Sequence, residues 1–201
     1  MTTTAISAKD VQELRQRTGA GMMECKKALQ ETNGNVDQAI ELLRKRGIAK
    51  AEKRAGRTTN QGQIVSYIHH NGKVGVLVEL NCETDFVANN PEFKELAREI
   101  ALQVASSAPI SVDKDGVPAE VVERERRIAE EQAKQSGKPA NIAEKIAQGK
   151  VDAFFKQVVL LDQPWVREPK KSISELIKET AAKFGEHITV RRFARFQMGE
   201  E

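Results

Sequence analysis

The sequence has few of the residues on which disulfide frameworks and small chemical sites depend. Its 201 residues include two cysteines, three histidines and one tryptophan. Two cysteines are too few for the multiple disulfides that hold small secreted domains together. No apolar run approaches the ~18 residues that a membrane-spanning helix requires. The N-terminal segment MTTTAISAKD also has no basic start followed by an apolar stretch, as a signal peptide would. We therefore expect a cytoplasmic protein that is neither secreted nor membrane-bound.

An excess of charge of one sign is also absent. There are 32 Lys and Arg residues against 29 Asp and Glu residues, which gives a formal net charge of +3. Hydrophobic residues make up 39 % of the chain and charged residues 30 %. This composition is too apolar and too balanced in sign for a disordered chain. The length predicts one or two domains with a compact core.

Patterns typical of catalytic or metal sites are missing as well. His69 and His70 are neighbours in a predicted strand, so we expect their side chains on opposite faces, where they cannot share a metal. Neither cysteine lies in a CxxC spacing. Cys82 falls on the apolar face of a predicted strand, which favours a buried structural thiol over a nucleophile. We predict no catalytic residue, no metal and no cofactor, and a Cys82-dependent hydrolase or redox enzyme is the weakest hypothesis.

Residues 7–47 show the periodicity of three short helices. Ser7 and Asn35 are suitable caps for the first and third helices, and Gly19 and Gly47 stand where these helices are predicted to end. Apolar residues recur at spacings of three and four between these signals, including Val11, Leu14, Met22, Cys25, Leu29, Val36, Ala39, Ile40 and Leu43. The pattern predicts a very small helical bundle whose core is marginal by itself.

Residues 44–57 are strongly basic, with seven Lys and Arg residues and Glu52 as the only acid. We interpret them as a linker or helical extension with a solvated basic face. Contact with nucleic acid or the ribosome is the alternative, because basic clusters neutralise phosphates. The absence of an aromatic residue, which would stack on bases, favours the first interpretation. The predicted organisation is a helical domain over 1–48, a basic linker over 49–61 and a body over 62–201.

The pattern changes to a period of two after Gly62. Apolar residues alternate over 63–69 and 74–82, and the Asn71-Gly72 pair between them is typical of a hairpin turn. Asn90-Pro91 opens a helix, Ser172 with Glu175 forms a capping box ahead of another, and residues 188–196 alternate as a third strand. Charged pairs at i,i+4 predict a well-solvated helix over 118–135. The fold class is α+β, with a small antiparallel sheet and flanking helices.

One short segment, Thr84-Asp85-Phe86-Val87, connects the second strand to the Asn90-Pro91 helix. Phe86 has two interpretations. It can lie under the sheet as a core residue, with Thr84 or Asp85 satisfying the turn backbone. It can also be an exposed apolar wedge that rigid elements position on both sides. The residues alone leave both interpretations open.

Long stretches of the sequence resemble the elongation factor Ts family, the guanine-nucleotide exchange factors of elongation factor Tu. The first is LRQRTGAGMMECKKAL (Leu14–Leu29) followed by NGNVDQAIELLRKRG, and the second is LNCETDFVANNPEF (Leu80–Phe93). The C-terminal part adds QSGKPANIAEKIAQGK, QPWV and RRFARFQMGEE. The resemblance covers nearly the whole chain, in the order of the family.

The resemblance implies that the helical head is a ubiquitin-associated-like domain that docks on elongation factor Tu. Arg15, Met22 and Met23 match family positions implicated in that contact. Methionine pairs suit a partner surface because their side chains adapt in shape. The alternative is that the methionines fill the bundle core. Because they occupy successive helix positions, we expect one in the core and one on the surface.

The resemblance further implies that Thr84, Asp85, Phe86 and Val87 are the element associated with displacing Mg²⁺ from elongation factor Tu. This favours the wedge interpretation of Phe86. The expected function is therefore exchange in translation elongation: the protein binds the GDP-bound or nucleotide-free partner and promotes GDP release, after which GTP can bind. It implies no chemical transformation, no membrane and no direct contact with nucleic acid.

The sequence departs from the pattern of the longer family members, which carry a second core repeat with its own hairpin and an inserted coiled-coil module. Only one Asn-Gly hairpin is present here. The chain resembles a short form with a single core sheet. A three-stranded sheet has open edges, so we expect a homodimer that completes its surface.

Overall fold

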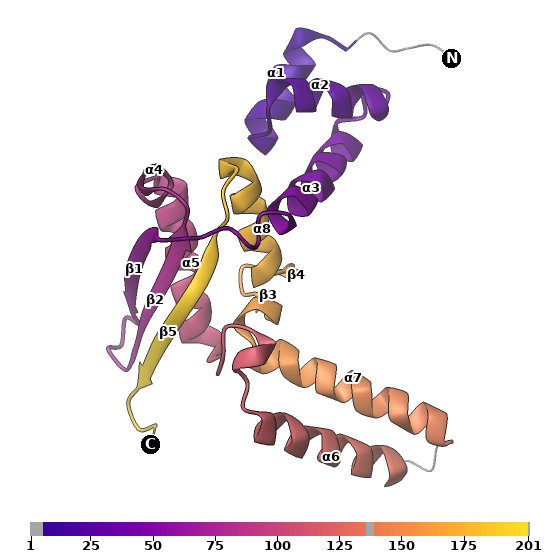
Figure 1. Ribbon diagram of the computed structural model, residues 1–201, viewed down its shortest axis with the longest axis vertical. Coiled ribbons are helices and arrows are strands. Elements are labelled where there is room, and N and C mark those ends of the chain that lie inside the picture. Colours follow the sequence, from indigo (N-terminus) through magenta and orange to yellow (C-terminus); the bar gives the residue numbers. More distant parts are fainter. Residues whose placement is uncertain (1–5, 136–138, 201) are drawn as a thin grey trace.

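The computed structural model describes residues 6–135 and 139–200 and has the predicted α+β architecture (Figure 1). A helical head lies at one end, a sheet with its covering helices forms the middle, and a pair of long helices projects from the other end. The head consists of α1 (Ala8–Thr18), α2 (Met22–Glu31) and the first part of α3 (Val36–Glu52). The remaining helices are α4 (Asp85–Ala88), α5 (Pro91–Ser107), α6 (Ala119–Gln135), α7 (Ala140–Val158) and α8 (Ile173–Phe184), with short 3₁₀ turns η1 (Lys114–Gly116) and η2 (Leu160–Asp162).

The predicted caps define the ends of the head helices. Ser7 and Asp10 form a capping box at the start of α1, and Asn35 accepts a hydrogen bond from the backbone of Gln38 at the start of α3. Gly19 ends α1 in the left-handed conformation, at φ 68°. The small core that results consists of Val11, Leu14, Cys25, Ala28, Leu29, Ala39 and Leu43.

The third helix is longer than predicted. It passes through Gly47, where the sequence pattern placed its end, and continues to Glu52. The second half of α3 packs on α8, and a Cβ atom at Gly47 would lie 2.9 Å from the Cβ of Ala182. Ala51 belongs to the main core. Gly47 is therefore a point of close helix approach and not a helix terminator, which corrects the prediction.

The main sheet has the strand order β1-β2-β5 and is antiparallel throughout. It is formed by β1 (Gln61–Ile68), β2 (Val74–Cys82) and β5 (Thr189–Gln197). The predicted turn joins β1 to β2, with Gly72 at φ 69° and the Asn71 side chain accepting a hydrogen bond from the Lys73 backbone. A separate two-stranded ribbon pairs β3 (Pro164–Trp165) with β4 (Glu168–Ser172).

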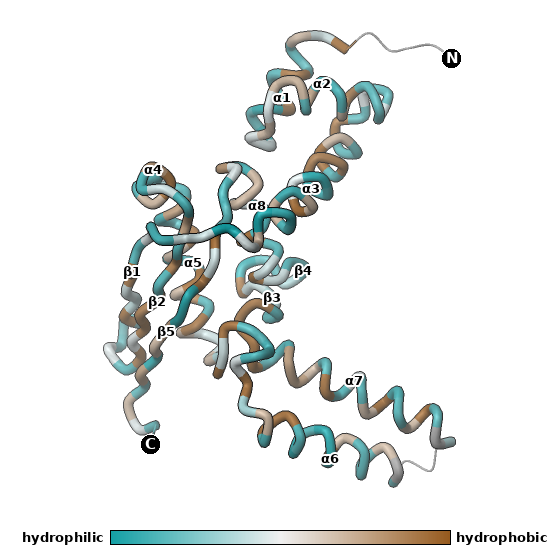
Figure 2. The backbone as a smooth tube through the Cα atoms, in the orientation of Figure 1, coloured by the Kyte–Doolittle hydropathy of each residue, from teal (hydrophilic) through white to brown (hydrophobic). Residues whose placement is uncertain are grey.

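Helices α4 and α5 cover one face of the sheet, and α8 lies beyond α5 against α3 (Figure 1). The buried positions alternate as the period of two requires, with Val76, Val78, Leu80 and Cys82 of β2 facing the core. The segment that crosses from α3 to β1 is mostly hydrophilic (Figure 2). On the opposite face of the sheet, Ile64, Ile68, Leu77 and Phe196 are exposed.

Helices α6 and α7 pack against each other as an antiparallel pair (Figure 1). Their seam is made of small residues: Ala129, Ala133, Ala143, Ala147 and Val151. The predicted solvated helix over 118–135 is thus half-covered, and this short chain carries a projecting two-helix module of its own. The charged i,i+4 pairs describe only its outer face and give no sign of the alanine seam. In the described part of the chain no helix is long and apolar enough to cross a membrane.

Two helix glycines allow a matched test of the α3–α8 contact. In the described part of the chain, no atom outside the local backbone of α7 lies within 4 Å of the Cβ position of Gly149, so Gly149→Ala should raise the free energy of unfolding by about 0.5–1 kcal/mol through helix propensity. Gly47→Ala should instead lower it by about 1 kcal/mol, because overpacking against Ala182 outweighs the same gain. Urea unfolding followed by circular dichroism measures both. Equal stabilisation by the two variants would contradict close packing at Gly47.

Candidate functional site

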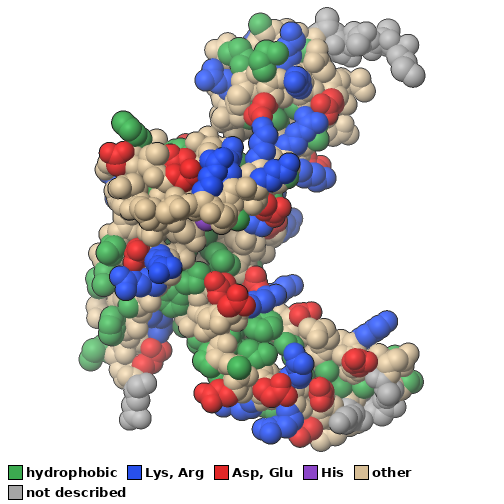
Figure 3. Space-filling model, viewed as in Figure 1, with side chains coloured by type: hydrophobic (Ala, Val, Ile, Leu, Met, Phe, Trp, Pro, Cys, Tyr) green, Lys and Arg blue, Asp and Glu red, His purple; other side chains and the backbone are tan. Residues whose placement is uncertain are grey.

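The segment that follows β2 presents a large aromatic side chain to solvent. Thr84 caps the four-residue helix α4, and Asn90 with Pro91 starts α5 immediately afterwards. Phe86 is 85 % exposed, whereas Val87 and Ala88 are buried. In Figure 3 a hydrophobic projection stands out at the position of α4. The interpretation of Phe86 as a core residue is therefore wrong, and the exposed interpretation stands.

The geometry of one helical turn explains this arrangement. Successive residues of an α-helix point about 100° apart, so two of four can face the core while the others face away. Val87 and Ala88 pack into the main core and hold α4 against the sheet. Asp85 and Phe86 are left on the outer side, both exposed. The helix is too short for this to be read from sequence periodicity.

A network of carboxylates and backbone amides lies behind α4. The Glu186 carboxylate accepts hydrogen bonds from the backbone N–H groups of Glu83 and Thr84. The Glu83 carboxylate in turn accepts one from the backbone N–H of His187, at 2.6 Å. This bond, aided by the guanidinium of Arg57, lowers the pKa of Glu83. Glu83 and Glu186 could not be predicted as partners from the sequence, because nothing in the local pattern pairs residues about a hundred positions apart.

Cys82 is buried at the end of β2, as predicted. Its thiol donates a hydrogen bond to the Thr84 carbonyl oxygen at 3.1 Å. Burial, with a further contribution from the Glu186 carboxylate, raises the pKa of Cys82 to about 11. The thiolate is therefore disfavoured, which is the opposite of what a nucleophilic cysteine requires.

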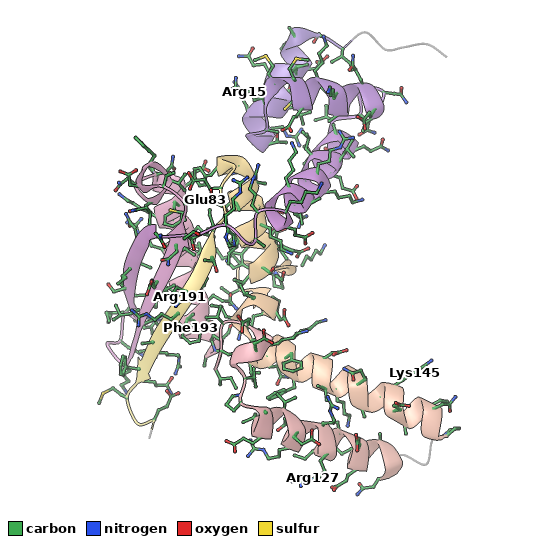
Figure 4. All side chains as sticks on the ribbon, viewed as in Figure 1. Arg15, Glu83, Arg127, Lys145, Arg191 and Phe193 are labelled. Carbon is green, nitrogen blue, oxygen red and sulfur yellow. The ribbon has the colours of Figure 1, made fainter. Side chains whose placement is uncertain are left out.

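The two methionines of the head are both on its surface. Met22 is 51 % exposed and Met23 63 % exposed. The expectation that one of them lies in the core is wrong, because α2 buries Cys25, Ala28 and Leu29 instead. Arg15 is also exposed, on the side of the head where α4 lies in the view of Figure 4. The head positions are thus available to a partner, but they belong to a different part of the molecule from α4.

The basic stretch 44–57 is largely paired with acids of the same chain. Ion pairs connect its cations to acidic residues of the head, α8 and the α4 network: Lys45–Glu41, Arg44–Glu179, Arg46–Glu31, Lys50–Glu24 and Arg57–Glu83. Five of the seven cations have an intramolecular partner, so fewer charges are available to neutralise phosphates. This weakens the nucleic-acid alternative.

The histidine pair is arranged differently from the prediction. β1 ends at Ile68, so the alternation of strand side chains does not extend over His69 and His70. Their ring centroids lie 4.2 Å apart, on the same side of the chain, which corrects the expectation of opposite faces. Within residues 6–135 and 139–200, no group of three or more His, Cys, Asp and Glu side chains is placed to hold a metal ion.

Comparison with known proteins gives a consistent result over nearly the whole chain. The family model described as Elongation factor TS matches residues 1–200. An elongation factor Ts of Thermosipho melanesiensis is 56 % identical over 97 % of this chain and 100 % of its own length. That of Fervidobacterium nodosum is 54 % identical over 97 % and 99 %, and that of Caldanaerobacter subterraneus subsp. tengcongensis is 51 % identical over 97 % and 98 %.

The raised pKa of Cys82 predicts slow alkylation. In a Cys25→Ala variant, which leaves Cys82 as the only thiol, the folded protein at pH 8 should react with iodoacetamide about a hundredfold more slowly than the urea-unfolded chain. A rise in pKa from 9.0 to about 11 removes that share of thiolate, and burial slows the reaction further. Mass spectrometry of timed samples gives the rate. A folded-state rate above the unfolded one would indicate a reactive cysteine and restore the enzyme hypothesis.

Proposed function

The chain belongs to the elongation factor Ts family, and from this premise we propose that it is a guanine-nucleotide exchange factor. The family gives it a role in translation elongation with elongation factor Tu as partner. In the proposed exchange reaction it binds the GDP-bound partner in the cytoplasm, displaces Mg²⁺ and promotes GDP release. GTP then binds and expels the factor.

The observation that carries this proposal is the exposure of Phe86 on an element anchored by buried neighbours. Transfer of a Phe side chain from water into an apolar cleft contributes roughly 2–3 kcal/mol. If the cleft is open only when the Mg²⁺- and phosphate-binding loops of the partner are displaced, binding of this protein must weaken nucleotide binding by the same coupling free energy. Each 1.4 kcal/mol of coupling corresponds to about tenfold in affinity.

Two parts of the chain divide the contact in this proposal. Residues 1–48 dock on the partner through Arg15, Met22 and Met23. Residues 62–201 contact it through the Thr84–Val87 segment, and residues 49–61 connect the two parts. The exposure of both methionines supports the head contact, because adaptable apolar side chains on a surface suit a partner interface. Asp85, exposed beside Phe86, is available to pair with a donor of the partner. No covalent bond is made or broken in the exchange, so the role is not that of an enzyme in the usual sense.

A second copy of this chain is the proposed occupant of the open sheet face. Ile64, Ile68, Leu77 and Phe196 stand exposed there, with Phe196 at 70 %. The strand register places them on neighbouring strands: Leu77 opposite Ala194 and Phe196 opposite Gly75. In a dimer with a two-fold axis, this face of one copy packs against the same face of the other, and these side chains are buried in both copies. Among the described residues, β1 and β5 also each pair with β2 alone, so each has one open edge.

Replacement of Phe86 tests the exchange function. Phe86→Ala should reduce the apparent second-order rate constant of GDP release from elongation factor Tu about 30-fold or more, which is the effect of losing ~2 kcal/mol of burial. The melting temperature should stay within a degree or so of the wild type, because the side chain is exposed in the free protein. The measurement is release of fluorescent GDP in a stopped-flow instrument.

Ile110→Ala is the matched control, since it also truncates an exposed apolar side chain but lies beyond the far end of α5. It should release GDP as the wild type does. A wild-type protein that is folded but does not accelerate release would refute the exchange proposal. A Phe86→Ala variant of unchanged activity would refute the role of the wedge.

The homodimer proposal is tested by sedimentation. At micromolar concentration the wild type should sediment as a dimer, and Leu77→Glu should sediment as a monomer because two carboxylates would be buried at the interface. Ile110→Glu, with the same change at an exposed site elsewhere, should remain dimeric. A monomeric wild type at every accessible concentration would exclude the dimer.

A further inference from the structure

We propose that Glu186, acting with Glu83, is a positioning residue that fixes the direction in which α4 presents Phe86. The two carboxylates form a clamp between residues 83–84, after β2, and residues 186–187, between α8 and β5. The proposal rests on the exchange function proposed above. It assigns a role to a residue that lies outside both the Thr84–Val87 segment and the head.

The clamp is reciprocal. Glu186 Oε2 accepts hydrogen bonds from the backbone N–H groups of Glu83 and Thr84, both at 3.1 Å, and its Oε1 accepts one from the Thr84 hydroxyl at 2.6 Å. Glu83 Oε1 accepts from the His187 N–H in the opposite direction. Each segment therefore places a carboxylate on the backbone of the other. Hydrogen bonds to a charged acceptor are stronger than neutral ones. Figure 4 shows Glu83 at the crossing of these segments.

The Thr84 hydroxyl links the clamp to α4. It donates its one proton to Glu186 and accepts a hydrogen bond from the backbone N–H of Val87, at 3.4 Å, as the cap of the helix. A hydroxyl has one proton and two lone pairs. Because the hydroxyl proton points toward the Glu186 carboxylate in this hydrogen bond, a lone pair of the hydroxyl oxygen is directed to the Val87 amide. Glu186 thus sets the orientation of the cap and, through it, the first turn of α4.

A four-residue helix needs this support. One helical turn is unstable by itself, because it fixes several backbone angles for very few hydrogen bonds. Val87 and Ala88 anchor the inner side of α4, but Phe86 is exposed and adds little to its own placement. The direction of the Phe86 side chain is therefore set by the backbone of α4, and the cap at Thr84 is its fixed end.

The same clamp includes the segment that leaves α3. The carbonyl oxygen of Arg57 lies 2.9 Å from His187 Nδ1. A carbonyl oxygen only accepts, so Nδ1 carries the proton in this contact. The Arg57 guanidinium also lies 3.4 Å from the Glu83 carboxylate. Three segments that are distant in the sequence thus meet directly behind α4.

Glu186→Gln tests the positioning role. The amide keeps one acceptor oxygen for the two backbone N–H groups but turns an NH₂ group toward Thr84, so the Thr84 hydroxyl loses the acceptor of its proton and the orientation that this bond fixed for the Val87 contact. The maximal rate of GDP release at saturating factor should fall about tenfold, while the half-saturating concentration changes less than threefold, because the head is unaltered. In the free variant, amide hydrogen exchange at Val87 should accelerate, and that of buried β2 amides should stay as in the wild type.

Glu99→Gln is the control, because Glu99 is also a partly buried carboxylate and binds Trp165 and Arg167 in another region. It should match the wild type in both readouts. Thr84→Ser, which keeps the hydroxyl, should retain the maximal rate, and Thr84→Val should lose as much as Glu186→Gln, with no further loss in the double variant. These relations hold only if the two residues act through one hydrogen bond.

The outcomes separate this inference from the exchange function. If the wild type accelerates GDP release and Glu186→Gln reaches the same maximal rate, the positioning role is overturned and the exchange function stays intact. Loss of β2 protection together with Val87 protection would also overturn it, since Glu186 would then support the whole fold. If the wild type does not accelerate release, the exchange function fails, and the positioning role, which rests on it, fails too. Amide hydrogen exchange at Val87 would then test only whether Glu186 holds α4 in the free protein.

Discussion

The main constraint on this structure is that the side chain of Phe86 is held exposed to solvent. The hydrophobic effect favours burial of Phe86 by roughly 2–3 kcal/mol, and a flexible loop would let the ring fold back onto the protein surface. The chain prevents this by fixing α4 on three sides. Val87 and Ala88 are in the core, Thr84 caps the start, and Asn90-Pro91 begins α5 directly after the end. The free energy left unrealised in the free protein is then available for binding.

The sequence predicts most of the secondary structure because its signals are local. The capping boxes at Ser7 and Ser172, the Asn71-Gly72 turn and the Asn90-Pro91 helix start all form as the pattern indicates. Each signal lies within four residues of the group it satisfies. The placement of Phe86 could not be predicted in the same way, since α4 has four residues and periodicity needs several turns to show a face.

The features that the sequence could not predict depend on distant segments. The bonds of Glu83 and Thr84 with residues 186 and 187 cross more than a hundred positions. α3 continues past Gly47 because Ala182 lies against it, although glycine is locally a helix terminator. From the sequence alone, the basic stretch is interpreted as a linker or extension with a solvated face, but several of its cations pair with acidic residues of the head and α8. In each case tertiary contacts override the local pattern.

Helix α8 connects the two proposed contacts with the partner. Arg44 and Glu52 of α3 pair with Glu179 and Lys178 of α8, and Gly47 packs on Ala182. The loop after α8 carries Glu186 and His187, which hold the base of α4.

If residues 49–61 were a flexible linker, docking of the head would only raise the effective concentration of α4 near the cleft of the partner that receives Phe86. With α3 packed on α8, the distance between the head and α4 is fixed instead. Free energy from head docking can then act on the position of Phe86. The proposed coupling to nucleotide release is in that case larger than burial of one side chain supplies alone.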